Sequence, residues 1–184
     1  MILIGFGNKA RQGKDLAAQA IVDYYENRRF QFSKHGLKPP VKAQRIGFAD
    51  ALYEVCRTEY GMIVKDAPLL QRVGAERREL DPLYWVKRAF ERVQGDANVV
   101  VISDVRYRNE VEYIKAKGGY SVNVTRLNRD GSRFVAQDRP ADHPSETELD
   151  SYTWDFRLLN SDGHQALLAE QAVTLAEYLR GLKA

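Results

Sequence analysis

The sequence lacks the features that mark secreted and membrane proteins. Its single cysteine, Cys56, excludes an intramolecular disulfide and favours a reducing cytosol. Cys56 lies in an apolar helical pattern, which predicts a small packing residue. No apolar run approaches the roughly 18 residues that span a bilayer. The start MILIGFGNKA has no charged leader before a long apolar core. We therefore expect a mature N-terminus, no membrane partner and a cytoplasmic location.

A strong excess of charge is also missing. The chain has 28 lysines and arginines against 25 acidic residues, a formal net charge of +3. Because non-specific affinity for nucleic acid grows with the number of phosphates neutralised, this small excess predicts no stable nucleic-acid binding. The 184 residues suffice for one domain over 1–184 with a sizeable core.

Strand-like and helix-like segments alternate along the chain. This alternation predicts an α/β three-layer fold with a mainly parallel sheet of about five strands, whose carboxyl ends bind ligands. Residues 127–153 have no periodicity and much charge, which predicts a functional lid. Asp81 before Pro82 predicts a helix cap, and Ser161 or Asp162 is available to cap the last helix. The expected strands cover 1–6, 44–50, 98–104, 120–126 and 155–160, and the expected helices cover 14–25, 51–61, 67–80, 81–95, 108–119 and the residues from 165 onward.

Residues 4–15, IGFGNKARQGKD, match two phosphate-binding motifs in part. Gly5, Gly7 and Ala10 fit the dinucleotide fingerprint G-x-G-x-x-G/A, whereas Gly13 and Lys14 fit the end of the phosphate loop G-x-x-x-x-G-K-[ST]. The dinucleotide interpretation needs an acidic residue about 20 positions further on. The segment RRFQFSKHG has none there, so the phosphate loop is favoured.

In a phosphate loop, backbone N–H groups and the next helix N-terminus surround an anion, and the lysine reaches the β- and γ-phosphates. Asn8 stands where the first loop glycine is expected; asparagine tolerates positive φ, and a loop one residue longer that starts at Gly7 is the alternative. Asp15 replaces the usual Ser or Thr and is tolerable beside a triphosphate if a cation or its water lies between them. The predicted ATP-binding residues are Gly7, Asn8, Lys9, Ala10, Arg11, Gln12, Gly13, Lys14 and Asp15.

Charged side chains follow the later strands. Asp104 ends the apolar strand VVVIS, where P-loop enzymes keep a carboxylate that orients Mg²⁺, although it could instead cap the helix that begins near Tyr107. Guanidinium groups match phosphate geometry, and a lid that carries them excludes water. Interleaved acids also allow a merely solvated loop, and His143 is expected to make loop hydrogen bonds. The arginines in these positions are Arg106, Arg126, Arg129, Arg133 and Arg139.

Five stretches recur together in the order expected of one family: GNKARQGKD, FADALYE, LLQRVGAERRELDPLYW, VVVISDVRYRNEVEYIKAKGG and DHPSETELD. This pattern resembles the bacteriophage-type deoxynucleoside monophosphate kinases, from about residue 2 to residue 160. A loop that ends in Gly-Lys-Asp is itself similar to that family, so Asp15 fits the pattern. Asn8 departs from it, because a glycine is expected at the loop start.

The resemblance implies a P-loop kinase-like fold that uses ATP and Mg²⁺ to phosphorylate a deoxynucleoside monophosphate for DNA precursor synthesis. It implies small-molecule nucleotides as partners, a host-cytoplasm location if phage-encoded, and an acceptor-binding insertion over about 50–95 that could form a homodimer. Trp85 is also a good core residue, and the core interpretation is favoured over a contact with the base. A P-loop kinase for another phosphorylated acceptor and a non-catalytic nucleotide-binding module stay open as alternatives. By position the implied roles are catalysis for Lys14, Asp15, Arg106, Arg129, Arg133 and Arg139, acceptor binding for Asp50, Arg72, Arg77, Trp85, Asp104 and Arg106, and metal binding for Asp15 and Asp104.

Overall fold

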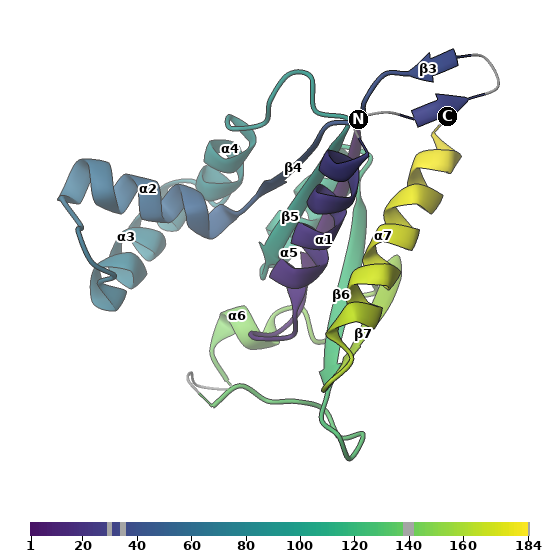
Figure 1. Ribbon diagram of the computed structural model, residues 1–184. Helices are drawn as coiled ribbons and strands as arrows, with labels where there is room; N and C mark the ends of the chain where they lie inside the picture. The colour runs from purple at the N-terminus through teal and green to yellow at the C-terminus, as the bar shows by residue number, and fades with distance from the viewer. Residues whose placement is uncertain (29–30, 34–35, 138–141, 184) are drawn as a thin grey trace.

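A five-stranded parallel sheet forms the centre of the molecule (Figure 1). The computed structural model describes residues 1–28, 31–33, 36–137 and 142–183. Each neighbouring pair in the order β4-β5-β1-β6-β7 is parallel, which confirms the predicted α/β three-layer class. The strands are β1 (Ile2–Gly7), β4 (Ala43–Ile46), β5 (Val99–Val105), β6 (Tyr120–Leu127) and β7 (Phe156–Ser161).

Helices cover both faces of the sheet (Figure 1). Alternate residues of β1 point to opposite sides, so Ile4 and Phe6 pack with α1 (Lys14–Asn27) and α7 (Gln165–Leu182). Leu3 packs on the other face with α5 (Arg108–Ala116). Because both faces are buried, β1 and β5 read as continuous apolar runs in the sequence.

Three helices form an arm beside β4 at one end of the sheet (Figure 1). They are α2 (Phe48–Tyr60), α3 (Ala67–Leu80) and α4 (Tyr84–Phe90). Asp66 caps α3 by accepting a hydrogen bond from the Leu69 N–H, at 3.0 Å. Cys56 is fully buried in this arm, which confirms its packing role. Among the described residues, no helix is long and apolar enough to cross a membrane.

Several predicted boundaries are wrong. The second strand ends at Ile46, not Asp50, and Asp50 lies in the first turn of α2. Asp81 supports the turn before α4 by accepting from the Leu83 N–H, and α4 begins only at Tyr84. Neither predicted cap serves α7, whose first flanking residue is His164. The sequence analysis also missed the hairpin of β2 (Gln31–Ser33) and β3 (Gly36–Lys38) and the short helix α6 (Pro144–Thr147).

Candidate active site

The predicted phosphate loop connects β1 to α1 at the carboxyl edge of the sheet. Gly13 has φ 102° directly before α1, a conformation that favours glycine. Asn8 also has positive φ, 100°, at the position where the motif expects glycine. The predicted tolerance of asparagine for this backbone is therefore confirmed.

The side chain of Asn8 gives a second reason for asparagine at the loop start. Its Nδ2 donates to Asn123 Oδ1 and to the Val124 carbonyl oxygen, each at 3.2 Å. A glycine would supply the backbone conformation but not these bonds. Asn8 thus fixes the beginning of the loop to β6, a relationship between residues more than a hundred positions apart.

Gly5 and Gly7 serve packing, although they resemble the dinucleotide fingerprint. A Cβ on Gly5 would lie 2.6 Å from Ile114 Cδ1, and a Cβ on Gly7 would collide with the Trp154 ring. These glycines let α5 and the segment before β7 approach the backbone of β1. Their spacing therefore reflects close packing of this face of the sheet.

Lys14 lies in the first turn of α1, and its side chain turns back into the loop. The residue is 5% exposed, and its Nζ donates to the carbonyl oxygens of Asn8, at 3.2 Å, and of Lys9. Burial, and then the nearby Arg106 guanidinium, lower the pKa of Lys14 from 10.5 to about 7. A buried amine at the N-terminus of a helix suits a polyanion, which would restore the charged form.

Asp15 points from α1 toward β4 and β5. Its Oδ1 accepts from the Ser103 hydroxyl at 2.7 Å and from Arg45 Nη2 at 2.9 Å. Burial alone would raise the pKa of Asp15, but the hydrogen bonds from Ser103 and Arg45 lower it overall. The carboxylate is thus held in its ionised form.

Arg45 is a site residue that the sequence analysis missed. From the end of β4 it contacts Asp15, the Ser103 Oγ at 3.0 Å and the Asp50 carboxylate at 3.4 Å. Its signal in the sequence was weak, because a single arginine beside an apolar residue also suits a solvated strand edge. With β4 ending before Gly47, Arg45 and Asp50 lie close enough to pair.

Asp104 accepts hydrogen bonds from the first turn of α2. Its Oδ1 accepts from the Phe48 N–H at 2.9 Å and its Oδ2 from the Ala49 N–H at 2.8 Å. The alternative that Asp104 caps the helix near Tyr107 is wrong, since Glu110 accepts from the Arg106 and Tyr107 N–H groups there. Burial raises the pKa of Asp104 despite the two amides, which oppose the shift.

Arg106 and Glu146 join the loop to α6. Arg106 Nη1 lies 2.8 Å from Glu146 Oε1, and Glu146 Oε2 accepts from the Ala10 N–H at 2.8 Å. Glu146 is 7% exposed. The sequence did not predict it as a site residue, because His143 was the candidate in the HPSE stretch. His143 makes the local hydrogen bonds expected of it, with Nδ1 accepting from the Ser145 N–H at 3.2 Å.

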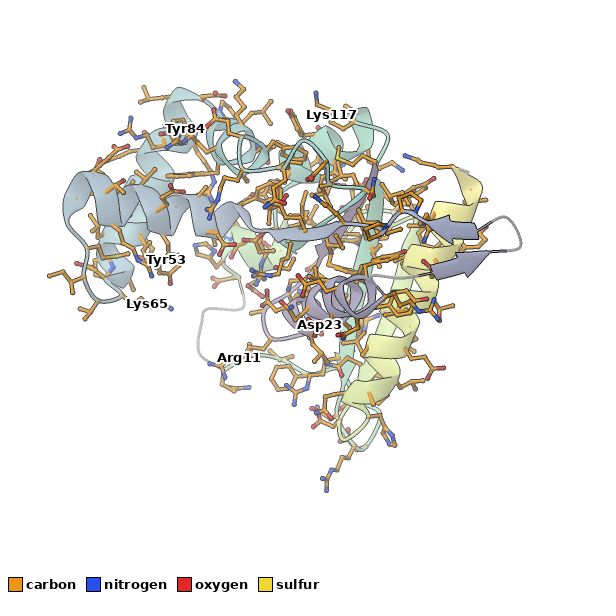
Figure 2. The ribbon with its side chains drawn as sticks, turned by 45° about the horizontal axis from the view of Figure 1, so that its top comes forward. Arg11, Asp23, Tyr53, Lys65, Tyr84 and Lys117 are labelled. Atoms are coloured by element: carbon orange, nitrogen blue, oxygen red, sulfur yellow. The ribbon has the colours of Figure 1, made fainter. Side chains whose placement is uncertain are left out.

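A cavity of about 250 Å³ lies at the carboxyl ends of β1 and β5. Figure 2 shows Arg11 on the loop, pointing outward, and Tyr53 and Tyr84 on the separate helical arm. The cavity brings together part of the predicted phosphate loop with Asp104, near the end of β5, and Arg106, directly after it. Its lining residues are Arg11, Gln12, Gly13, Lys14, Asp15, Ser103, Asp104 and Arg106.

The arm keeps other predicted site residues away from this cavity. Trp85 is 2% exposed in the core and its Nε1 donates to the Gly74 carbonyl oxygen, at 3.1 Å, so it offers no surface to a base. Arg72 pairs with Glu76 at 3.3 Å, and Arg77 pairs with Glu59 at 2.9 Å. Arg72 and Arg77 therefore form ion pairs within the arm and do not line the cavity.

The predicted lid arginines do not meet at the cavity either. Arg129 is exposed in the turn after β6, and Arg133 lines a different cavity. Arg139 lies outside the described residues. Arg126, at the end of β6, pairs with Asp162 at 2.6 Å. Among the described arginines, Arg45 pairs with Asp15, and Arg106 pairs with Glu146.

The donor set suits Mg²⁺ bound together with phosphates. Asp15 offers an exposed, ionised carboxylate, and hard oxygen ligands are what Mg²⁺ prefers. Asp104 already accepts two amide bonds, which suits contact through water. Within the part of the chain that the structure describes, no group of three or more His, Cys, Asp or Glu side chains could hold a metal alone. Phosphate oxygens would complete such a site.

Comparisons with known proteins find viral relatives and a kinase. No family model matches the sequence. The uncharacterized protein ORF76 of Ictalurid herpesvirus 1 (strain Auburn) is 29% identical over 187 residues, which cover 95% of this chain and 69% of that protein. The "Putative deoxynucleotide monophosphate kinase" of Acanthamoeba polyphaga mimivirus is 44% identical over 63 residues, 34% of this chain and 28% of that protein. A solved Mycobacterium tuberculosis APS kinase aligns over 96% of both chains with 10% identity and a TM-score of 0.47.

Proposed function

We propose that this chain is a P-loop nucleotide kinase that transfers the γ-phosphate of ATP to a deoxynucleoside monophosphate, giving ADP and a deoxynucleoside diphosphate. The observation that carries the proposal is the buried Lys14 ammonium inside the glycine loop, beside Asp15, Asp104 and Arg106 in one cavity. The partial match to the mimivirus protein supports the same activity by its name.

The mechanism follows from where the charges lie. Lys14 and the loop amides would bind the donor phosphates, and Arg106 would neutralise charge that develops on the transferred group. Asp15, with Asp104 through water, would hold Mg²⁺, which supplies charge neutralisation of the phosphates when bound. The acceptor phosphate is already an anionic nucleophile, so no strong general base is needed. Catalysis would consist of positioning and electrostatic stabilisation.

Asp50 and Arg45 extend the site toward the arm. Asp50 also lines a groove of about 490 Å³ along α2, with Tyr53, Glu54, Arg57, Thr58 and Arg92, which follows α4. We place the acceptor nucleoside on this side of the Lys14 cavity, because the Asp15–Arg45–Asp50 chain connects the two. The predicted homodimer through residues 50–95 stays a prediction; Ile63, Val64 and Leu80 are exposed there.

An acceptor panel tests the proposal. The protein is incubated with ATP, Mg²⁺ and each deoxynucleoside monophosphate in turn, and ADP formation is measured. We expect acceptor-dependent ADP with at least one of them and loss of several orders of magnitude in Lys14→Ala. If no deoxynucleoside monophosphate stimulates ADP release, the acceptor assignment is wrong. Near-normal turnover in Lys14→Ala would show that the loop is not the donor site.

A further inference from the structure

A second cavity, of about 370 Å³, adjoins the phosphate loop. It lies between the loop residues Asn8 and Lys9, the second half of β6, the segment 133–136 and the segment 146–157. Neither Lys14 nor Asp104 lines it, so it is distinct from the cavity described above, although Gln12 lines both. Its volume falls within the range of about 300–1,000 Å³ that is usual for small-molecule sites.

The sheet side of this cavity presents a buried amide. Asn123 is 9% exposed, and its Oδ1 accepts from Asn8 Nδ2 at 3.2 Å and from Thr125 Oγ1 at 2.7 Å. Its Nδ2 makes no hydrogen bond with any residue in the described ranges. An amide donor that is accessible in a cavity wall can bond to a ligand that offers a carbonyl oxygen or ring nitrogen.

Aromatic side chains also line the cavity. Trp154 is buried, and its ring packs edge-on against Tyr152 with centroids 5.1 Å apart and planes at 78°. Phe134 lies on the lid side of the cavity. Such walls offer large apolar area at low conformational cost and favour a planar, largely apolar body.

The unpaired charge around the cavity is positive. Asp150 is paired with Lys9 at 2.8 Å, and Glu146 with Arg106 at 2.8 Å. Arg133 and Arg157 also line the cavity, and across the described part of the chain neither guanidinium forms an ion pair or side-chain hydrogen bond. Guanidinium groups bind phosphate through two parallel hydrogen bonds, so the pair favours a phosphorylated ligand.

We propose that this cavity is a second nucleotide site that takes a nucleoside 5′-monophosphate. The base would lie against Trp154 and accept from Asn123 Nδ2, and the phosphate would meet Arg133 and Arg157. Because Asn8 belongs both to this wall and to the phosphate loop, occupancy here is coupled to the loop's conformation, and by linkage the coupling is reciprocal. The inference rests on the cavity's own side chains and not on the reaction at Lys14.

The two tryptophans allow a site-specific test. In protein labelled with 5-fluorotryptophan, ¹⁹F NMR gives one signal for Trp154 and one for Trp85, assigned with Trp85→Phe. We expect titration with one or more of the four deoxynucleoside 5′-monophosphates to shift the Trp154 signal saturably. Inorganic phosphate and the deoxynucleoside that corresponds to the responding monophosphate should each bind more weakly than that monophosphate; equal binding of either one would overturn the nucleotide assignment.

Two variants locate the binding. Arg157→Gln should weaken the Trp154 response by at least about tenfold, the scale of a lost charge-assisted contact. Asn123→Asp keeps the oxygen that Asn8 and Thr125 use but removes the amide donor, and it should weaken the response too. Arg88→Gln, an exposed arginine on α4, is the matched control and should change nothing.

The same titration distinguishes this site from the acceptor site of the proposed kinase. Loss of the Trp154 response in Arg157→Gln with acceptor-dependent turnover still detectable would separate the two sites, whereas loss of both together would show that this cavity is the acceptor site and overturn the proposal. The proposal is overturned if no monophosphate shifts the Trp154 signal, or if the midpoint is unchanged in both Arg157→Gln and Asn123→Asp. If the kinase assay fails but a monophosphate still shifts the Trp154 signal, the proposed function is wrong and the second site stands.

Discussion

Glu146 and Arg106, forty positions apart, form a largely buried ion pair with 2.8 Å between Arg106 Nη1 and Glu146 Oε1. The other carboxylate oxygen accepts from the Ala10 N–H. One side chain on α6 therefore fixes both the phosphate loop and the arginine that follows β5. The Glu146 carboxylate positions these groups without lining the Lys14 cavity itself.

Glu146→Gln tests this positioning role. A glutamine side chain offers one acceptor oxygen where two donors, Ala10 N–H and the Arg106 guanidinium, need partners. Leaving a buried charge without its partner costs about 3–5 kcal/mol, so we expect a clear loss in the free energy of unfolding. We also expect kcat to fall more than acceptor KM rises, because Arg106 is misplaced and not removed. Denaturant unfolding and steady-state kinetics measure the two effects.

Glu148→Gln is the matched control, at the residue that directly follows α6. Glu148 is exposed, and among the described residues its side chain accepts from the Arg108 N–H alone, a bond that glutamine preserves. It should change stability by less than about 0.5 kcal/mol, as is usual for surface substitutions. Equal effects of the two substitutions would argue against a special role for Glu146.

The pKa of Lys14 predicts how nucleotide binding depends on pH. Burial and Arg106 lower this pKa to about 7 in the free protein, so above pH 7 the lysine is mostly neutral and must take up a proton to bind phosphates. We expect the affinity for ADP, whose terminal phosphate is almost fully ionised above pH 7.5, to fall by up to about tenfold per pH unit above that pH. Calorimetry in two buffers with different ionisation heats reports the proton uptake directly.

Lys14→Arg separates this titration from other groups. A guanidinium stays charged throughout the range, so the variant should bind with an affinity that is nearly flat between pH 7.5 and 8.5. A slope as steep as that of the wild type would mean that another group takes up the proton.

The sequence predicted the sheet and the loop well because both leave short-range patterns. Four consecutive β-branched residues before Asp104 indicate a buried strand, and Gly13-Lys14 at a strand-to-helix junction indicates a phosphate loop. These signals depend on neighbours along the chain, which local propensity and periodicity describe. The class of fold and the placement of Lys14 and Asp15 in one cavity therefore needed no structure.

The contacts that the sequence could not show span long sequence distances. The missed residue Glu146 meets Ala10 across 136 positions, and the predicted residue Asn8 meets Asn123 across 115 positions. A lone glutamate in a polar segment has no local signature of burial. Trp85 shows the opposite case: an aromatic side chain suits a base or a core, and only its burial decides between them.

Asp104→Asn should loosen the arm as well as the site. Both carboxylate oxygens accept backbone N–H groups at the start of α2, from Phe48 and Ala49, and an asparagine would turn its NH₂ group toward one of them. The lost cap should cost about 1–2 kcal/mol of stability. Asp66→Asn is the control, because Asp66 uses one oxygen to cap α3 and asparagine retains it. Equal losses in both variants, measured by denaturant unfolding, would contradict this assignment.

Glu110 makes stability depend on pH. It is buried at the start of α5, where its Oε2 accepts from the Arg106 and Tyr107 N–H groups at 2.7 and 3.1 Å. Burial raises its pKa from 4.5 to about 8, with a contribution from Asp104, although the two amides oppose the shift. Between these values the unfolded chain releases a proton that the folded protein keeps, so Glu110 lowers the free energy of unfolding as the pH rises.

Glu110→Gln should remove this slope. Glutamine keeps an acceptor oxygen for the Arg106 and Tyr107 N–H groups but does not ionise. The difference in unfolding free energy between variant and wild type should therefore move in favour of the variant by up to about 1.4 kcal/mol per pH unit between pH 5 and 7. Other titrating groups, including the histidines, cancel in that difference. Denaturant unfolding at pH 5, 6 and 7 measures it, and a difference that stays constant over this range would show that Glu110 is already ionised in the folded protein.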